Sequence, residues 1–381
     1  MLFKDIQGNN IIKKQLIDSV FNDRVSHSQL LNGKCGSAKL HLALAFAQYL
    51  NCSSRLKEDS CGICSSCTKY ESLTHPDLHL IFPVIKSNLS KLSISDNFVD
   101  LWRDYILNNP HGSLNGWIDI LSNQTNKLAT GGIYKEEANV LHKKLAFKNY
   151  EAQYRVIIIW MPEKMNLESS NSMLKLLEEP PKGTVFLLVS ENLDLLIATI
   201  KSRLQIIQVH DFTLEDMINY FPHKAKSEIL KVKKLTNSSL GQMITYFQND
   251  IEDDNFLENF TLWMRYVYKV DIINISNWVD KMSQIGKVKQ RLFLIYATKM
   301  IRECLIINLS SNSLLRVNEE EYKFVTKFAS FINEENSIPI FETLELTIKS
   351  IDRNAGPKIL FFELSLQMIK FLKVKSKFVN K

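Results

Sequence analysis

Residues 33–40 read GKCGSAKL, and this stretch decides how the first half of the chain is organised. It follows a short apolar run at 29–31 and opens a segment, 39–50, whose apolar residues recur with helical spacing. A glycine-containing turn between a strand and a helix, ending in a lysine, is the setting of a phosphate-binding loop. An ordinary strand-to-helix turn is the alternative interpretation, because so short a motif also occurs without phosphate.

The loop lacks two residues that a working phosphate site uses. Such a site has a glycine before the lysine and a serine or threonine after it to hold magnesium, where this chain has Ala38 and Leu40. Leucine offers no ligand atom, and the alanine methyl group disfavours backbone conformations that glycine adopts freely. Lys39 alone could still meet a phosphate. We therefore expect Gly33, Gly36 and Lys39 to form a degenerate, non-functional loop.

A further residue that ATP hydrolysis requires is missing at the end of a later apolar run, 156–160. An acidic residue normally ends this strand, where it holds magnesium and activates the nucleophile. Here the run ends in Trp160 and Met161, and Glu163 lies beyond Pro162, out of register. Two independent losses predict a nucleotide site that does not hydrolyse ATP.

Strands and helices alternate up to about residue 210. Short apolar runs bounded by turn residues predict strands at 29–31, 78–82, 156–160, 184–189 and 205–209. Helical segments lie between them, notably 39–50 and 167–177, and this alternation predicts a largely parallel sheet covered on both faces. Beyond that point apolar residues recur at three- and four-residue spacing, which predicts helices only.

An acidic, polar stretch at 249–255 divides the helical part in two. We therefore predict three domains: an α/β domain over 1–210, a small helical domain over 211–250 and an all-helical domain over 251–381. Residues 86–135 lie between two predicted strands and are interpreted as an insertion with small helices of its own, for which we expect a structural role.

Composition narrows the class of protein. The 381 residues include 47 Lys and Arg against 41 Asp and Glu, a formal charge of +6 that permits contact with nucleic acid without requiring it. The lysine-rich end, 370–381, is interpreted as a solvated tail, with nucleic-acid contact as the alternative. No apolar run approaches the ~20 residues that span a bilayer, and the opening MLFKDIQ lacks the features of a signal peptide. We therefore expect a cytoplasmic protein.

Four closely spaced cysteines give the clearest metal signal in the sequence. Cys52, Cys61, Cys64 and Cys67 form the pattern C-x8-C-x2-C-x2-C. Two-residue spacing lets neighbouring thiolates converge on one tetrahedral ion, and four sulfurs complete the shell of a structural zinc site. An iron–sulfur cluster and unmetallated or disulfide-bonded cysteines are the alternatives. His75, eight residues later, is expected in a turn that leads into the next strand.

Arg203 is a further candidate. It follows Ser202 and stands just before the predicted strand 205–209. A surface arginine is usually a solvated charge. An arginine offered to a neighbouring subunit's nucleotide, however, stabilises charge on a transferring phosphoryl group. The position therefore admits a catalytic role in trans, without catalysis by this chain itself.

Taken together, these residues resemble a known family. The resemblance runs through HSQLLNG at 27–33, the four cysteines, THPD at 74–77, NSMLKLLEEPP at 171–181 and the pair Ser202 and Arg203. These motifs are similar to those of the delta prime subunits of bacterial DNA polymerase III clamp loaders, which are AAA+ proteins. The similarity covers about residues 1–210, and beyond them only the helical character and the run 358–360 resemble the family.

The resemblance implies a RecA-like domain with a zinc module, a helical lid and a helical collar. It also implies a five-subunit ring with gamma/tau and delta subunits that loads the sliding clamp onto primed DNA, in which this chain does not hydrolyse ATP. Arg203 matches the family's Ser-Arg finger, although Leu204 replaces the cysteine that follows there. The insertion at 86–135 also departs from the family pattern.

Two other functions remain as alternatives. An ATP-hydrolysing gamma/tau-type subunit shares the cysteine module and the EEPP segment, but Ala38, Leu40, Trp160 and Met161 argue against it. A dedicated DNA-binding module is disfavoured because the positive charge is modest and forms no concentrated stripe.

Overall fold

The computed structural model describes residues 1–86, 93–109, 111–125, 131–236, 239–248, 256–309, 314–352 and 355–374. The chain forms two compact units, Met1–Thr245 and Tyr246–Lys381, which are considered separately. The predicted boundary at 249–255 lies outside the described residues. The division into three domains therefore stays a prediction.

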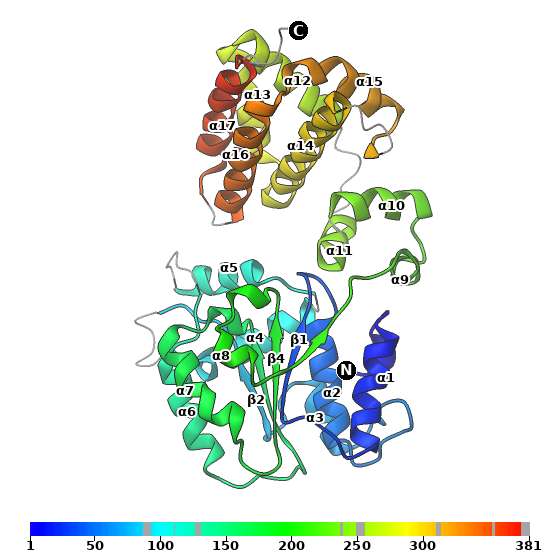
Figure 1. The fold of residues 1–381 in the computed structure, drawn as a ribbon, viewed down its shortest axis with the longest axis vertical. Coiled ribbons are helices and arrows are strands. Elements are labelled where there is room, and N and C mark those ends of the chain that lie inside the picture. Colours follow the sequence, from blue (N-terminus) through cyan, green and yellow to red (C-terminus); the bar gives the residue numbers. More distant parts are fainter. Residues whose placement is uncertain are drawn as a thin grey trace. The chain divides into compact units, whose positions relative to one another are not determined.

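A five-stranded parallel sheet forms the centre of the first unit (Figure 1). Its strands are β1 (Ser28–Asn32), β2 (Leu78–Ile81), β3 (Arg155–Trp160), β4 (Thr184–Ser190) and β5 (Gln205–Gln208). They lie in the order β2-β3-β4-β1-β5, and every pairing is parallel. Each strand falls on one of the five apolar runs of the sequence, to within one residue at either end. The register sets Leu30 of β1 beside Leu188 of β4.

Helices cover both faces of the sheet, and this is why the strands are apolar throughout (Figure 1). All residues of β3 and β4 are buried. Helix α2 (Lys39–Asn51) contacts β1, β3 and β4 and is buried along its whole length. On the other face, Phe186 and Leu188 pack with Leu177 of α7 (Leu167–Glu178) and Leu141 of α6 (Lys135–Leu145). The predicted α/β fold class is confirmed.

Further helices complete this unit. They are α1 (Asn10–Phe21), α3 (Ser65–Glu71), α4 (Val99–Asn108), α5 (Leu114–Thr125), α8 (Ala198–Lys201), α9 (Leu214–Tyr220), α10 (Lys226–Leu235) and α11 (Leu240–Gln248). Helices α9 to α11 are those predicted beyond residue 210. Helix α7 begins after Asn166, whose side chain accepts a hydrogen bond from the Ser169 N–H and so caps the helix.

The two ends of the stretch interpreted as an insertion, 86–135, lie next to each other. Val84 and Gly132 exchange backbone hydrogen bonds of 2.9 and 3.0 Å, so the ends of the stretch are joined. Helices α4 and α5 between them bury the large apolar side chains that the sequence supplies, including Trp102 and Trp117. Phe82, just after β2, stacks on Trp102 at 4.9 Å. The insertion therefore packs onto the end of the sheet.

The second unit is helical in its described part. Its helices are α12 (Phe256–Lys269), α13 (Ile272–Gln284), α14 (Lys287–Asn308), α15 (Glu319–Phe328), α16 (Glu334–Asp352) and α17 (Pro357–Leu372). Trp263 and Trp278 stack at 5.1 Å in its core, and the Trp263 indole donates to the Ser365 hydroxyl. Over the described residues of the whole chain, the helices are too short or too polar to traverse a bilayer.

Candidate functional site

The degenerate loop follows β1 and leads into α2, as the sequence predicts. Two of its glycines are required by the surroundings. A Cβ on Gly33 would lie 2.7 Å from the Ser37 Oγ and 3.0 Å from the Val209 carbonyl oxygen. Gly36 has a φ of +81°, and a Cβ there would lie 2.2 Å from the Ser239 Oγ. Ser239 thus covers the loop at the point where a phosphate loop turns.

Lys39 is engaged inside the chain. Its side chain is 4% exposed, and its ammonium group donates to the Lys34 carbonyl oxygen at 2.9 Å and pairs with Glu191 at 3.1 Å. Glu191 follows β4, and its N–H donates to the Glu163 carboxylate at 2.9 Å. The lysine that could still meet a phosphate is therefore already neutralised by a carboxylate of its own chain.

The end of β3 is occupied by aromatic rings. Trp160 is 2% exposed and packs edge-on against Trp102 of α4, with ring centroids 6.0 Å apart. Trp117 of α5 meets Phe82 edge-on and donates its indole N–H to the Pro83 carbonyl oxygen at 2.7 Å. The insertion therefore supplies an apolar cluster where a hydrolytic site would hold magnesium.

A histidine of the insertion also reaches α2 and the helices beyond residue 210. His111 lies 4.7 Å, centroid to centroid, from His41 of α2, and it contacts Phe212 and Tyr220 edge-on. Burial, and then the charge of Lys39, lower the pKa of His111 to about 4. Burial, and then His111, lower the pKa of His41 to about 3, so both rings are neutral at pH 7. A Cβ on Gly241 would lie 2.4 Å from the His111 carbonyl oxygen, so only glycine fits at this position of α11.

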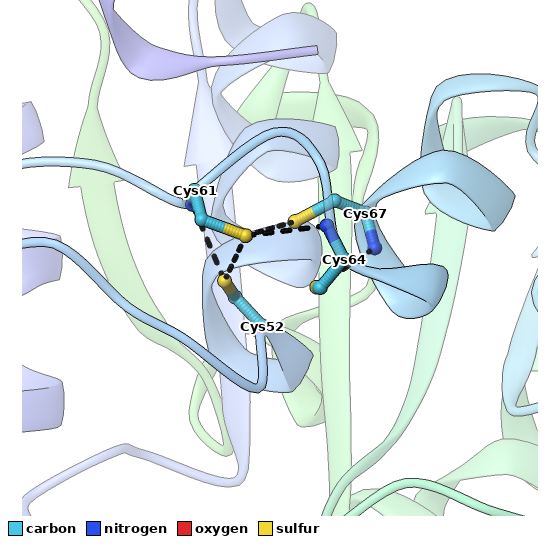
Figure 2. A group of neighbouring side chains, drawn as sticks. All are labelled: Cys52, Cys61, Cys64 and Cys67. Atoms are coloured by element: carbon cyan, nitrogen blue, oxygen red, sulfur yellow. Dashed lines mark hydrogen bonds between the residues drawn. The ribbon is translucent and has the colours of Figure 1, made fainter.

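The four cysteines converge as predicted (Figure 2). Cys52 caps the end of α2, and Cys64 is the N-cap of α3. All four Sγ atoms lie within 4.8 Å of one another, with Cys61 3.5 Å from Cys52 and 3.9 Å from Cys67. This cluster can bind a metal ion. Cys52, Cys61, Cys64 and Cys67 form no disulfide bond in the structure.

Backbone N–H groups point at these sulfurs. The N–H of Cys61 donates to Cys52, that of Cys64 to Cys61 and that of Cys67 to Cys64, at 3.3 to 3.4 Å. Burial acts to raise the pKa of the Cys64 thiol, but hydrogen bonds from Ser53 and Cys67 outweigh it and lower that pKa to about 5. Such donors stabilise thiolates, the form that binds metal.

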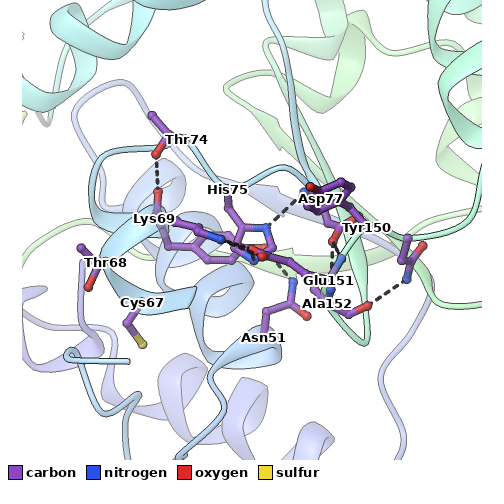
Figure 3. Close-up of polar contacts among 12 residues, drawn as sticks. Asn51, Cys67, Thr68, Lys69, Thr74, His75, Asp77, Tyr150, Glu151 and Ala152 are labelled. Carbon is purple, nitrogen blue, oxygen red and sulfur yellow. Dashed lines mark hydrogen bonds and ion pairs between the residues drawn. The ribbon is translucent and has the colours of Figure 1, made fainter. Parts of the chain in front are cut away.

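The THPD motif connects the cysteine region to the sheet (Figure 3). Asp77, 2% exposed, accepts the backbone N–H groups of Tyr150, Glu151 and Ala152 at 2.7 to 2.9 Å. The Asp77 N–H donates to the His75 Nδ1, which confirms the turn expected for His75. Burial lowers the pKa of His75, and its carboxylate neighbours oppose that shift.

Arg203 lies between α8 and β5 with its side chain 29% exposed. Its guanidinium group pairs with Glu178, the last residue of α7, through two nitrogens, and donates to the Thr199 carbonyl oxygen at 2.6 Å. Ser202 donates its hydroxyl to the same carbonyl oxygen at 3.1 Å. The EEPP segment therefore holds the arginine within this chain.

The structure keeps the three groups of predicted residues apart. The 13 residues of α2 span ~20 Å, and the loop lies at one end while Cys52 lies at the other. Sequence reasoning missed Glu191, His111 and Ser239 around the loop. The sequence gives little indication of these three contacts, because the residues follow the loop by 70 positions or more. Only the apolar residues of the insertion indicate that it packs against the rest of the domain.

The fold and the sites define the class of protein: an AAA+-like parallel-sheet domain that carries a four-cysteine cluster and is followed by a helical region. A family model described as "DNA polymerase III, delta subunit" matches residues 8–213, more than half of the chain. The chain belongs to this family, that of the DNA polymerase III delta′ subunits.

The chain is also similar to individual known proteins. The chain is 28% identical to DNA polymerase III subunit delta′ of Bacillus subtilis over 56% of this chain and 53% of that protein. It is 24% identical to subunit tau of the same organism over 61% of this chain and 33% of tau. The solved structure of a gamma subunit-related protein from Thermotoga maritima aligns over 96% of this chain and 100% of its own, with 12% identity and a TM-score of 0.39. The chain thus spans about half of the delta′ relative and a third of tau.

Proposed function

We propose that the chain is a subunit of the DNA polymerase III clamp loader that does not hydrolyse ATP. The observation that carries this proposal is the state of the phosphate loop. Lys39 is paired with Glu191, Gly36 is covered by Ser239, and Trp160 stands where a magnesium ligand is needed. In this role the chain acts in the cytoplasm, in a ring with gamma/tau and delta subunits that loads the sliding clamp onto primed DNA.

The same proposal assigns Arg203 to a neighbour's active site. The arginine follows a four-residue helix at the surface, and Glu178 holds its guanidinium group in a defined orientation. An arginine in this setting supplies positive charge to a transferring phosphoryl group of the next subunit. The chain would then accelerate hydrolysis that it does not itself perform.

For the cysteine cluster we propose one structural zinc ion. A tetrahedral zinc ion with Zn–S bonds of ~2.3 Å sets its sulfurs ~3.8 Å apart. The sulfur–sulfur distances of 3.5 and 3.9 Å fit this geometry, and the span of 4.8 Å favours one ion over a cluster of several irons. Cys52, Cys61, Cys64 and Cys67 would hold the ion. It would join the end of α2 to the start of α3, without a role in a reaction.

ATP hydrolysis by the purified chain separates this proposal from a gamma/tau-type subunit. We expect no magnesium-dependent hydrolysis above a protein-free control, because the chain lacks both magnesium ligands. Turnover that co-purifies with the chain and is abolished in Lys39→Met would contradict the proposal and favour the gamma/tau alternative.

A further inference from the structure

A basic cavity lies at the end of the sheet where β2 and β3 begin, and its lining includes neither the phosphate loop, nor the four cysteines, nor Arg203. Its volume is about 330 Å³. Four cationic residues line it, namely Lys143, Lys144, Lys148 and Arg155, and Asp77 is the one acidic residue among the described residues of its lining. Positive charge therefore dominates the lining of the cavity.

Two buried charged groups fix its walls. Arg155, 3% exposed, donates to the carbonyl oxygens of Lys144 at 3.2 Å and Phe147 at 2.8 Å, and so it satisfies the last turn of α6. Asp77 accepts the N–H of Tyr150 at 2.7 Å and fixes the start of the next loop (Figure 3). The backbone of Phe147 is therefore fixed by a hydrogen bond from Arg155, and that of Tyr150 by a hydrogen bond to Asp77.

The carboxylates near the cavity are already occupied. Asp77 accepts three backbone N–H groups, Asp96 pairs with Lys144 at 2.6 Å, and Glu151 pairs with Lys69 at 2.6 Å. Lys143 and Lys148 are exposed and form no ion pair within the described part of the chain. Their charge is therefore available to an anionic ligand.

Two aromatic rings project from the same lining. Phe147 is 77% exposed and Tyr150 is 82% exposed. Free rings beside unpaired lysines are the combination that single-stranded nucleic acids use, because bases stack on the rings while phosphates meet the ammonium groups. A protein partner of ordinary affinity would instead need a larger apolar centre.

We propose that this cavity is a binding site for single-stranded nucleic acid. The rings of Phe147 and Tyr150 receive bases, and Lys143 and Lys148 receive the flanking phosphates. The site uses neither the phosphate loop, nor the cysteines, nor Arg203. It is therefore independent of the proposed function.

The test is fluorescence anisotropy of a labelled oligothymidylate titrated with the full chain at several salt concentrations. Each lysine–phosphate contact contributes ~0.7 to the slope of log K against log salt for a single strand. We expect Lys143→Gln combined with Lys148→Gln to make that negative slope shallower by ~1.4. Phe147→Ala combined with Tyr150→Ala should weaken binding by ~10-fold or more and leave the slope unchanged.

The matched control is Lys323→Gln combined with Lys327→Gln, which removes the same charge from exposed positions on α15. This variant should bind as the wild type does. The proposal is overturned if the full chain does not bind the oligonucleotide, if the control loses as much slope as the cavity variant, or if the aromatic variant binds normally. Equal affinity for a duplex of the same length would also overturn it, because paired bases cannot stack on the rings.

Discussion

Gly36 is the residue at which the loop and its cover meet. Its φ of +81° is a conformation that L side chains rarely adopt, and Ser239 leaves no room for a Cβ. Its sequence neighbours Cys35 and Ser37 give no hint of the second constraint, because Ser239 is about 200 residues away.

Gly36→Ala should destabilise the first unit by ~2 kcal/mol or more, since backbone strain and a steric contact add. Denaturant unfolding of the full chain measures this. Gly286→Ala, in the second unit, separates the two causes, because Gly286 has a φ of +84° with open space around it. Gly356→Ala has neither feature and should be nearly neutral. Equal effects at Gly36 and Gly356 would contradict the packing described here.

For single residues, the sequence shows which groups of a working phosphate loop are missing more readily than it shows which contacts take their place. Ala38, Leu40 and Trp160 can be compared with the needs of a working loop position by position, so their misfit is visible without a structure. The pairing of Lys39 with Glu191 is not visible, because it joins residues 152 apart in the chain. The sequence leaves Lys39 as the one loop residue that could still meet a phosphate, and its ion pair with Glu191 opposes such contact.

Buried hydrogen bonds of Ser95 join the insertion to the end of β2 and to α6. The Ser95 hydroxyl donates to the Phe82 carbonyl oxygen at 3.1 Å, and the Phe82 N–H donates to that hydroxyl at 3.0 Å. Glu137, in the first turn of α6, accepts the Ser95 N–H at 2.7 Å. Burial raises the pKa of Glu137 from 4.5 to about 7, although its hydrogen bonds to Ser95 oppose the shift.

This pKa makes stability depend on pH. Between pH 4.5 and about 7 the folded chain keeps the Glu137 proton while the unfolded chain releases it, so the free energy of unfolding falls as pH rises through this window. Glu137→Gln should flatten that part of the profile, measured by denaturant unfolding at a series of pH values. Ser95→Ala should extend the fall to higher pH, because the Ser95 hydroxyl is shared between the Phe82 carbonyl oxygen and a Glu137 carboxylate oxygen 3.0 Å away, where it favours the charged form. An unchanged profile in Glu137→Gln would contradict this assignment.

The cysteine cluster joins two elements, and its metal should be measurable. Metal analysis should find about one zinc ion per chain, and Cys67→Ser should lose it and lower the melting temperature, because ion binding contributes to folding. Cys35→Ser lies outside the cluster and should keep the metal. A fully folded, metal-free wild type would rule out the proposed zinc site.

Elements were more predictable than the contacts between them. The five strands stand out because parallel strands are apolar on both faces, and Asn166 marks the start of α7. The packing partners of the insertion could not be predicted, because the sequence around Trp102 and Trp117 does not show which residues these rings pack against. In the structure Trp102 packs against Trp160 and Trp117 packs against Phe82, at the end of the sheet.

For the whole molecule, alternating strands and helices were enough to predict the class of fold. The cysteine spacing predicted the cluster, because ligands nearby in sequence need little help from the fold. Units are harder. The helices from 211 to 245 belong to the first compact unit, where His111 contacts Phe212 and Tyr220. Such contacts cannot be inferred from the composition of a linker.

We propose that this chain assists hydrolysis that another subunit performs. ATP hydrolysis in a ring reconstituted with gamma/tau, delta and clamp subunits measures this assistance. Arg203→Ala should lower the ring's rate, with the site that Arg203 faces losing ~10³-fold or more, while subunit composition stays unchanged.

The control is Lys201→Ala, which removes a positive charge two residues away, at the end of α8. It should leave the rate of the ring unaltered. A ring that assembles with Arg203→Ala and hydrolyses ATP at the wild-type rate would contradict the account.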